Sequence, residues 1–188
     1  LNGIFSLAIW DSSKQELLLS RDTFGIKPLY YSLTKNGFAF SSEIKSLIKL
    51  LPEIIGTELI NFLEIDNSAI NRYLTYLWCP GEQTPLRNLK KINPGEALII
   101  KDGKIKDQVT WYELPFTPKQ EILSAKKKAA IKIQSYLRKA VHRQMISDVP
   151  VGAFLSGGLD SSSIVAFARE KNPNIQCFTI DNTNGNFD

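Results

Sequence analysis

The stretch "FLSGGLDSS", residues 154–162, decides how the second half of this chain is expected to fold. It ends the apolar run "VPVGAFL" at 149–155 and leads into "SSSIVAFAREK" at 161–171, which has a helix-like pattern. A continuous apolar run is typical of a parallel strand buried on both faces, and "IQCFTI" at 175–180 predicts a second such strand. The order strand, helix, strand predicts the start of a doubly wound α/β domain.

The two glycines of this stretch indicate an anion-binding turn. A turn from a parallel strand into a helix places the helix N-terminus at the carboxyl edge of the sheet, where ligands bind. Free N–H groups and the helix dipole at that point favour an anion such as phosphate. Gly157 and Gly158 allow close approach and positive φ, and Ser156, Ser161 and Ser162 add hydroxyl donors.

The carboxylate of Asp160 distinguishes this turn from the common phosphate loops. No lysine follows the glycines, so the stretch is neither G-x-x-x-x-G-K-[ST] nor G-x-G-x-x-G. Asp160 would repel a phosphate unless Mg²⁺ lay between the two groups. That arrangement suits a pyrophosphate leaving group, and hence cleavage of ATP between its α and β phosphates. The plain alternative is a glycine-rich turn in which Asp160 caps the helix.

Residues 1–114 have the pattern of antiparallel strands. Phe5, Leu7 and Ile9 alternate with the side chains between them, which predicts a strand. Residues 53–85 have a helical tendency and end in a loop, "CPGEQTP", at 79–85. The other expected elements are a strand at 16–22, a hairpin around Asn36-Gly37, a helix over 42–51 ended by Pro52, and a hairpin around Asp102-Gly103.

Composition changes at residues 115–118, where Pro115 and Pro118 predict a linker between two domains. A long amphipathic helix is expected beyond it, with an apolar stripe from Ile122 to Met145. Basic residues gather between 119 and 143, where Glu121 is the single acidic residue. A solvated helix face explains this charge, and a nucleic-acid contact or a surface that attracts anionic substrates is the alternative.

Composition also bounds the class of protein. Hydrophobic residues make up 43% of 188 residues, and no apolar run approaches the roughly 20 residues that span a bilayer. Cys79 and Cys177 lack a C-x-x-C spacing, so we expect neither a disulfide nor a zinc site, and a cytoplasmic setting fits. The chain opens on a strand pattern without Met and stops after a strand, so we expect a segment of a longer protein.

The motifs together resemble one family. "SGGLDSS" resembles the pyrophosphate loop of the ATP pyrophosphatase (PP-loop) superfamily, and "SDVPVGAFLSGGLDSS" resembles the glutamine-hydrolysing asparagine synthetases. Upstream, "LNGIFSLAIWD", "RDTFGIKPLYY", "FAFSSEIKSLI" and "INPGEALII" are similar to the second half of that family's glutaminase domain. The resemblance implies an α+β part over 1–114, belonging to the αββα sandwich of an N-terminal nucleophile (Ntn) hydrolase. It also implies the start of a Rossmann-like, parallel α/β PP-loop domain over 119–188.

The activity implied by the resemblance is that of a two-step ligase. Glutamine would be hydrolysed to release ammonia, while ATP and Mg²⁺ would convert aspartate to β-aspartyl-AMP. Ammonia would then displace AMP to give asparagine. The expected partners are these small molecules, with neither nucleic acid nor membrane, and a homodimer stays open. We expect the present segment alone to be inactive, because both domain cores are truncated.

The resemblance also implies roles for particular residues. The pyrophosphate loop would consist of Ser156, Gly157, Gly158, Leu159, Asp160, Ser161 and Ser162, with Asp160 meeting the metal through Mg-pyrophosphate. Phe154 and Ile180 match adenine contacts, and plain core packing is the alternative for both. The family's nucleophile is an N-terminal cysteine that this segment lacks, so no catalytic residue is assigned and neither Cys79 nor Cys177 inherits that role.

Two other functions stay open at this point. Relatives with the same two domains modify other carboxylates, such as sugars, peptides or β-amino acids. A PP-loop protein that modifies tRNA, with the lysine-rich helix on RNA phosphates, is a third reading. Arg21, Asp22, Lys27 and Glu43 lie in family-like segments, and we expect ion pairing and turn formation to explain them.

Overall fold

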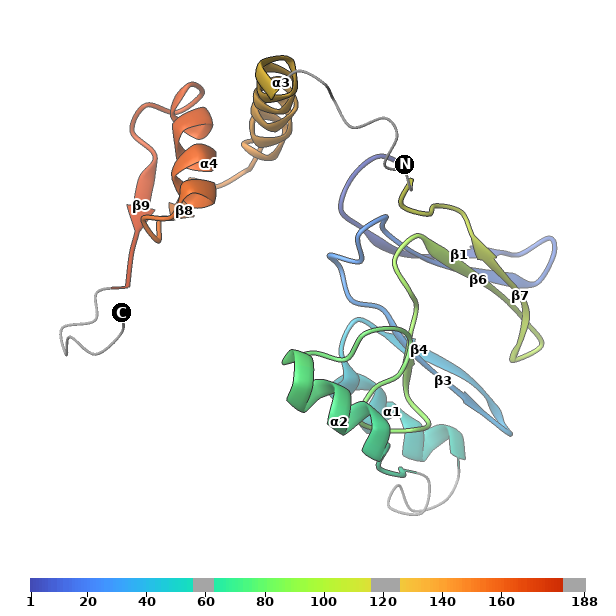
Figure 1. Cartoon of the computed structure of the whole chain (residues 1–188). Coiled ribbons are helices and arrows are strands. Elements are labelled where there is room, and N and C mark those ends of the chain that lie inside the picture. The colour runs from blue at the N-terminus through green and yellow to red at the C-terminus, as the bar shows by residue number, and fades with distance from the viewer. Residues whose placement is uncertain (56–62, 116–125, 181–188) are drawn as a thin grey trace. The chain divides into compact units, whose positions relative to one another are not determined.

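The structure is a computed structural model that describes residues 1–55, 63–115 and 126–180. The chain divides into two compact units, Leu1–Phe116 and Thr117–Asp188, and each is described by itself (Figure 1). The expected linker at 115–118 lies outside the described residues except for Pro115.

The first unit is built on two antiparallel sheets. One sheet has the order β1-β2-β6-β7 and the other has the order β4-β3-β5. The strands of the first are β1 (Ser6–Asp11), β2 (Glu16–Arg21), β6 (Glu96–Lys101) and β7 (Lys104–Thr110). Those of the second are β3 (Tyr30–Thr34), β4 (Gly37–Ser41) and β5 (Lys90–Lys91).

The side-chain alternation of the second sheet explains how the layers stack. Tyr31, on one face, joins Leu19 and Leu98 of the other sheet in a buried cluster. Ala39, on the opposite face, packs with Leu47 of α1 (Ile44–Ile55) in a second cluster. The layers are therefore sheet, sheet and helix. Leu19 and Leu47 are fully buried, and each such leucine stabilises the fold by about 1.5–3 kcal/mol.

The hairpins predicted around Asn36-Gly37 and Asp102-Gly103 are both present. Asp102 and Gly103 have φ of 50° and 70°, as a type I′ turn requires. In the other hairpin Thr34 pairs with Gly37, so Lys35 and Asn36 form the loop and Gly37 begins β4. The expected hairpin around Asn36-Gly37 is therefore confirmed, with its turn at residues 34–37.

Pro52 does not end the first helix, contrary to the sequence prediction. It lies inside α1, which continues to Ile55. Proline removes one helical hydrogen bond, but Leu51 beside it is fully buried. Ile54 and Ile55 also pack against the core cluster, and this burial favours the continued helix. The helical tendency of the following region is borne out by α2 (Asn67–Tyr76), where the Asp66 side chain accepts from two backbone N–H groups.

The second unit confirms the predicted strand, helix, strand order. Its elements are α3 (Lys126–Gln144), β8 (Gly152–Phe154), α4 (Leu159–Arg169) and β9 (Gln176–Phe178). β8 and β9 pair in parallel, and α4 connects them (Figure 1). Both strands were expected to be buried, yet their residues are exposed or half-buried. The described residues of this unit supply only α3 and α4 besides the two strands, which are too few elements to bury both faces of the sheet.

The expected apolar stripe of the long helix is only partly buried. Val141 is 9% exposed and packs in the second unit, whereas Ile133 is 63% exposed. Arg138 and His142 of α3 both reach Glu170 after α4, at 3.0 and 3.2 Å. Ile122 and Ala125 lie outside the described residues. Among the described residues, no helix is long and apolar enough to cross a membrane.

Candidate nucleotide-binding loop

The loop between β8 and α4 is open to solvent. Ser156, Gly157 and Gly158 are all exposed, so no packed side chain covers the turn among the described residues. Gly157 has a φ of 82°, and a Cβ added there would meet nothing within 4 Å. Glycine is therefore favoured at this position by backbone conformation alone, because the left-handed region costs other residues about 1–2 kcal/mol.

Serine hydroxyl groups fix the shape of the turn. The Ser156 and Ser161 Oγ atoms lie 3.0 Å apart, and the Ser156 N–H donates to Ser161 Oγ at 3.3 Å. Ser161 Oγ also contacts the Gly158 carbonyl at 3.2 Å. The loop is thus tied to the first turn of α4 through one side chain, while Ser162 is exposed and its N–H donates to Gly158 O.

The first turn of α4 presents donors and one carboxylate. Helix geometry leaves the N–H groups of Leu159, Asp160 and Ser161 without intrahelical acceptors. Gly158 is the N-cap, and the helix has no side-chain cap. Asp160 is therefore not the capping residue, and in the described part of the chain no side chain pairs with its exposed carboxylate. An anion with a bridging cation fits this donor set.

The two residues predicted to contact adenine follow or end the paired strands. Phe154 ends β8 and is 83% exposed, with its ring 6.4 Å from that of Phe178. Ile180 follows β9 and is 91% exposed. Core packing, the alternative for both, is not found within the described residues. Leu155 N–H donates to Phe178 O at 2.8 Å, which continues the strand pairing up to the start of the loop.

The "RDTFGIKP" stretch of the first unit has a structural explanation. The Arg21 guanidinium donates to the carbonyls of Gly25, Lys27 and Ile92, and the last contact is 2.7 Å. The Asp22 carboxylate accepts from the N–H groups of Phe24, Ile26 and Lys27. Backbone hydrogen bonds thus hold this turn. Burial lowers the pKa of Arg21, and the charge of Asp22 acts in the opposite direction, so the expected attraction between the two side chains also contributes.

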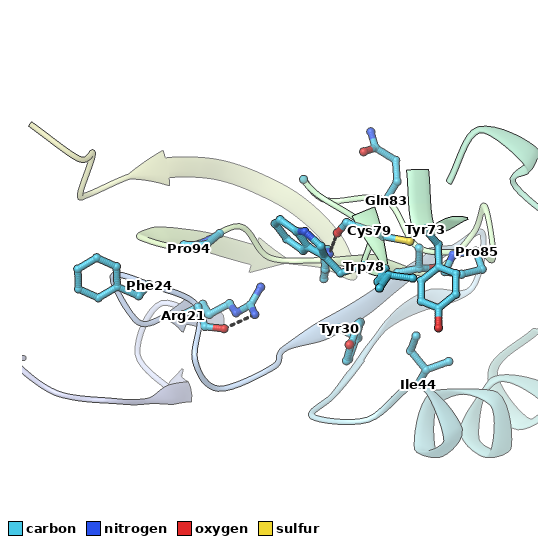
Figure 2. Close-up of a pocket in the computed structure, with 15 residues that line it drawn as sticks. Arg21, Phe24, Tyr30, Ile44, Tyr73, Trp78, Cys79, Gln83, Pro85 and Pro94 are labelled. Atoms are coloured by element: carbon cyan, nitrogen blue, oxygen red, sulfur yellow. Dashed lines mark hydrogen bonds between the residues drawn. The ribbon is translucent and has the colours of Figure 1, made fainter. Parts of the chain in front are cut away.

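The first unit contains a hollow that the sequence did not indicate. Figure 2 shows Phe24 and Pro94 at one end and Tyr73 and Ile44 at the other, with Trp78 between them. Its volume is about 550 Å³. The sequence predicts only a loop at residues 79–85, and no local motif in this segment indicates a binding site.

Comparison with protein families assigns both units. Residues 1–112 match the glutamine amidotransferase domain, and residues 132–188 match asparagine synthase. The first match covers more than half of the chain and defines the class, a glutamine amidotransferase. More particularly, the chain belongs to the family of the glutamine-hydrolysing asparagine synthetases.

Individual relatives agree over nearly the whole chain. Glutamine-hydrolysing asparagine synthetase 1 of Bacillus subtilis is 36% identical over 96% of this chain, and synthetase 3 of that organism is 31% identical over 96%. Amidase chry2 of Gibberella zeae is 31% identical over 87%. The chain spans 27%, 28% and 23% of the lengths of these three relatives.

Proposed function

We propose that the full-length protein makes asparagine from aspartate, glutamine-derived ammonia and ATP through β-aspartyl-AMP, releasing AMP and pyrophosphate. The observation that carries this proposal is the open loop at 156–162, where Gly157 has a positive φ and free N–H groups of α4 meet an unpaired carboxylate. The names of the Bacillus subtilis relatives support the choice of aspartate and glutamine as substrates.

Different residues in and beside the loop would bind different parts of ATP. Backbone N–H groups at 157–161 and the hydroxyl groups of Ser156 and Ser162 would hold the pyrophosphate part of the nucleotide. Phe154 and Ile180 would contact adenine. Bound Mg²⁺ supplies charge neutralisation between Asp160 and the phosphates, which stabilises the negative charge on the leaving pyrophosphate.

The division of labour between the units is part of the proposal. Residues 1–114 would belong to an Ntn-type glutaminase domain, and 119–188 would begin the PP-loop synthetase domain. The sheet, sheet, helix layering of the first unit and the parallel β8-α4-β9 order of the second support this division. We expect the enzyme to act in the cytoplasm.

The identity of the nucleotide products tests the proposal. The full-length protein, given aspartate, glutamine and ATP, should form AMP and asparagine in equal amounts. Release of ADP in place of AMP would exclude this chemistry. Asp160→Ala should abolish AMP formation and leave glutamine hydrolysis intact, and Asp160→Asn should do the same with less change of shape. Loss of both activities together would instead indicate a structural role for Asp160.

A second acceptor is favoured by one comparison. The relative in Gibberella zeae is named an amidase, although it matches 87% of this chain. A carboxylate other than aspartate would then be adenylated by the same loop. ATP–pyrophosphate exchange measured with aspartate and with sugar, peptide and β-amino acid carboxylates separates the two, since only the true acceptor should stimulate exchange.

A further inference from the structure

Two cationic side chains line the hollow in the first unit, and a third acts on one of them. Arg21 ends β2, Arg72 lies on α2, and Lys91 ends β5. Arg21 and Lys91 line the hollow itself. Burial lowers the pKa of Lys91, and the nearby guanidinium groups of Arg21 and Arg72 lower it further, while Cys79 acts in the opposite direction. Both guanidinium groups are therefore close enough to repel the Lys91 ammonium group.

Among the described residues Asp22 acts favourably on Arg21, but no acidic side chain compensates Lys91. None of the residues that line the hollow is Asp or Glu, and no carboxylate is among the groups that affect Lys91. The neighbouring lysine on the same strand is different, because Lys90 forms an ion pair with Glu82 at 2.9 Å. A half-buried ammonium group without a counter-charge is costly, and such a site gains free energy when an anion enters it.

The hollow also contains N–H groups without hydrogen-bond acceptors among the described residues. The Lys91 ammonium donates to the carbonyl of Cys79, which uses one of its three N–H bonds. Lys91 lines the hollow, so its two remaining N–H bonds are available to an acceptor there.

The walls of the hollow are apolar and aromatic. Lys91 Nζ lies 5.5 Å from the centre of the Trp78 ring. Tyr73 and Leu77 add exposed apolar surface beside it, at 50% and 80% exposure. Leu77 ends α2 in the left-handed region, with a φ of 59°, where glycine is the usual residue. Backbone strain of this kind concentrates at ligand-binding sites.

We propose that this hollow binds a small organic carboxylate with an apolar body, whose acidic group pairs with Lys91 while its body lies against Trp78 and Tyr73. The volume of about 550 Å³ lies in the range of small-molecule pockets. The site lies in the first unit and does not involve the loop at 156–162. It therefore does not depend on the function proposed above.

Ligand-observed fluorine NMR on the full-length protein tests this proposal. The probe is 4-fluorobenzoate, with the uncharged 4-fluorobenzamide and inorganic phosphate as competitors. The benzoate should bind at least about tenfold more tightly than the benzamide, because a charge-assisted hydrogen bond is roughly twice as strong as a neutral one. Phosphate should compete weakly, because it has no apolar body to place on Trp78.

Matched lysine variants localise the binding. Lys91→Met should weaken benzoate binding about tenfold, whereas Lys90→Met, which removes an equal charge from the same strand, should not. Thermal unfolding checks that each variant is folded.

Four results would overturn the proposal. These are no binding to the full-length protein, equal binding of benzoate and benzamide, equal loss in both lysine variants, and binding unchanged in Lys91→Met. No binding would mean that another part of the protein fills the hollow. Competition by phosphate as strong as that by benzoate would exclude the apolar half of the proposed ligand.

Discussion

The hydroxyl oxygens of Ser156 and Ser161 lie 3.0 Å apart across the glycine turn, and so join the loop to the first turn of α4. Ser161 Oγ also reaches the Ser156 N–H and the Gly158 carbonyl. One side chain thus holds three parts of a loop that is otherwise exposed to water.

Removal of this hydroxyl group should loosen the loop. We expect Ser161→Ala to raise the KM for ATP about three- to tenfold, since a lost hydrogen bond costs about 0.5–1.5 kcal/mol. The measurement is the rate of AMP formation against ATP concentration. Ser163→Ala is the matched control, because Ser163 Oγ donates only to the carbonyl of Leu159 within the helix. Equal effects of the two substitutions would contradict the role given to Ser161.

The backbone conformation of Gly157 gives a second prediction. With a φ of 82° and open space around it, Gly157→Ala should meet strain but no clash, at about 1–2 kcal/mol. Gly158 has a φ of −72°, so Gly158→Ala should be tolerated better by the backbone. The measurement is the free energy of unfolding of the second unit in urea, compared between the two variants. A larger loss of stability in Gly158→Ala would mean that the turn has another conformation.

We expect that lysine cannot replace Arg21 in stabilising the first unit. Its guanidinium donates to three backbone carbonyls at once, and an ammonium group has no planar fork with which to reach all three. We expect Arg21→Lys to lower the free energy of unfolding of the first unit by about 2–3 kcal/mol, because three backbone carbonyls, two of them in partly buried hydrogen bonds, lose donors. Arg87→Lys, at an exposed ion pair with Glu64, should change it by less than about 1 kcal/mol.

The buried carboxylate of Asp22 predicts a pH dependence of stability. Burial favours a higher pKa for Asp22, but hydrogen bonds from the N–H groups of Lys27, Ile26 and Phe24 outweigh it and lower the pKa below 3.8. Because the folded pKa is depressed, this stabilisation is present above pH 3.8. It is lost as the pH falls through the folded value.

A substitution isolates this contribution. Asp22→Asn should lower stability at neutral pH, and its stability should fall less steeply than that of the wild type in strong acid. The measurement is the free energy of unfolding of the first unit in urea from about pH 6 to about pH 2, a window that spans the unfolded pKa. Glu113→Gln, at an exposed side chain, should leave the acid dependence unchanged. Parallel pH curves for wild type and Asp22→Asn would contradict the assignment.

Much of the local structure could be read from the sequence. Asp102-Gly103 forms the predicted type I′ turn because both residues tolerate positive φ, and this preference depends on the two residues alone. The parallel pairing of β8 and β9 around α4 followed from apolar runs and a glycine turn. The seven loop residues were identified by motif, and their roles stay a prediction that the nucleotide experiments will test.

Tertiary structure decided what depends on distant segments. Pro52 stays within α1 because Leu51 and Ile54 pack against a core whose other members lie elsewhere in the chain. The pairing of β2 with β6 joins residues about 80 positions apart, which no local pattern specifies. The hollow beside Lys91 likewise exists only after β2, α2 and β5 meet, because charge repulsion and desolvation depend on neighbours in space and not on neighbours in sequence.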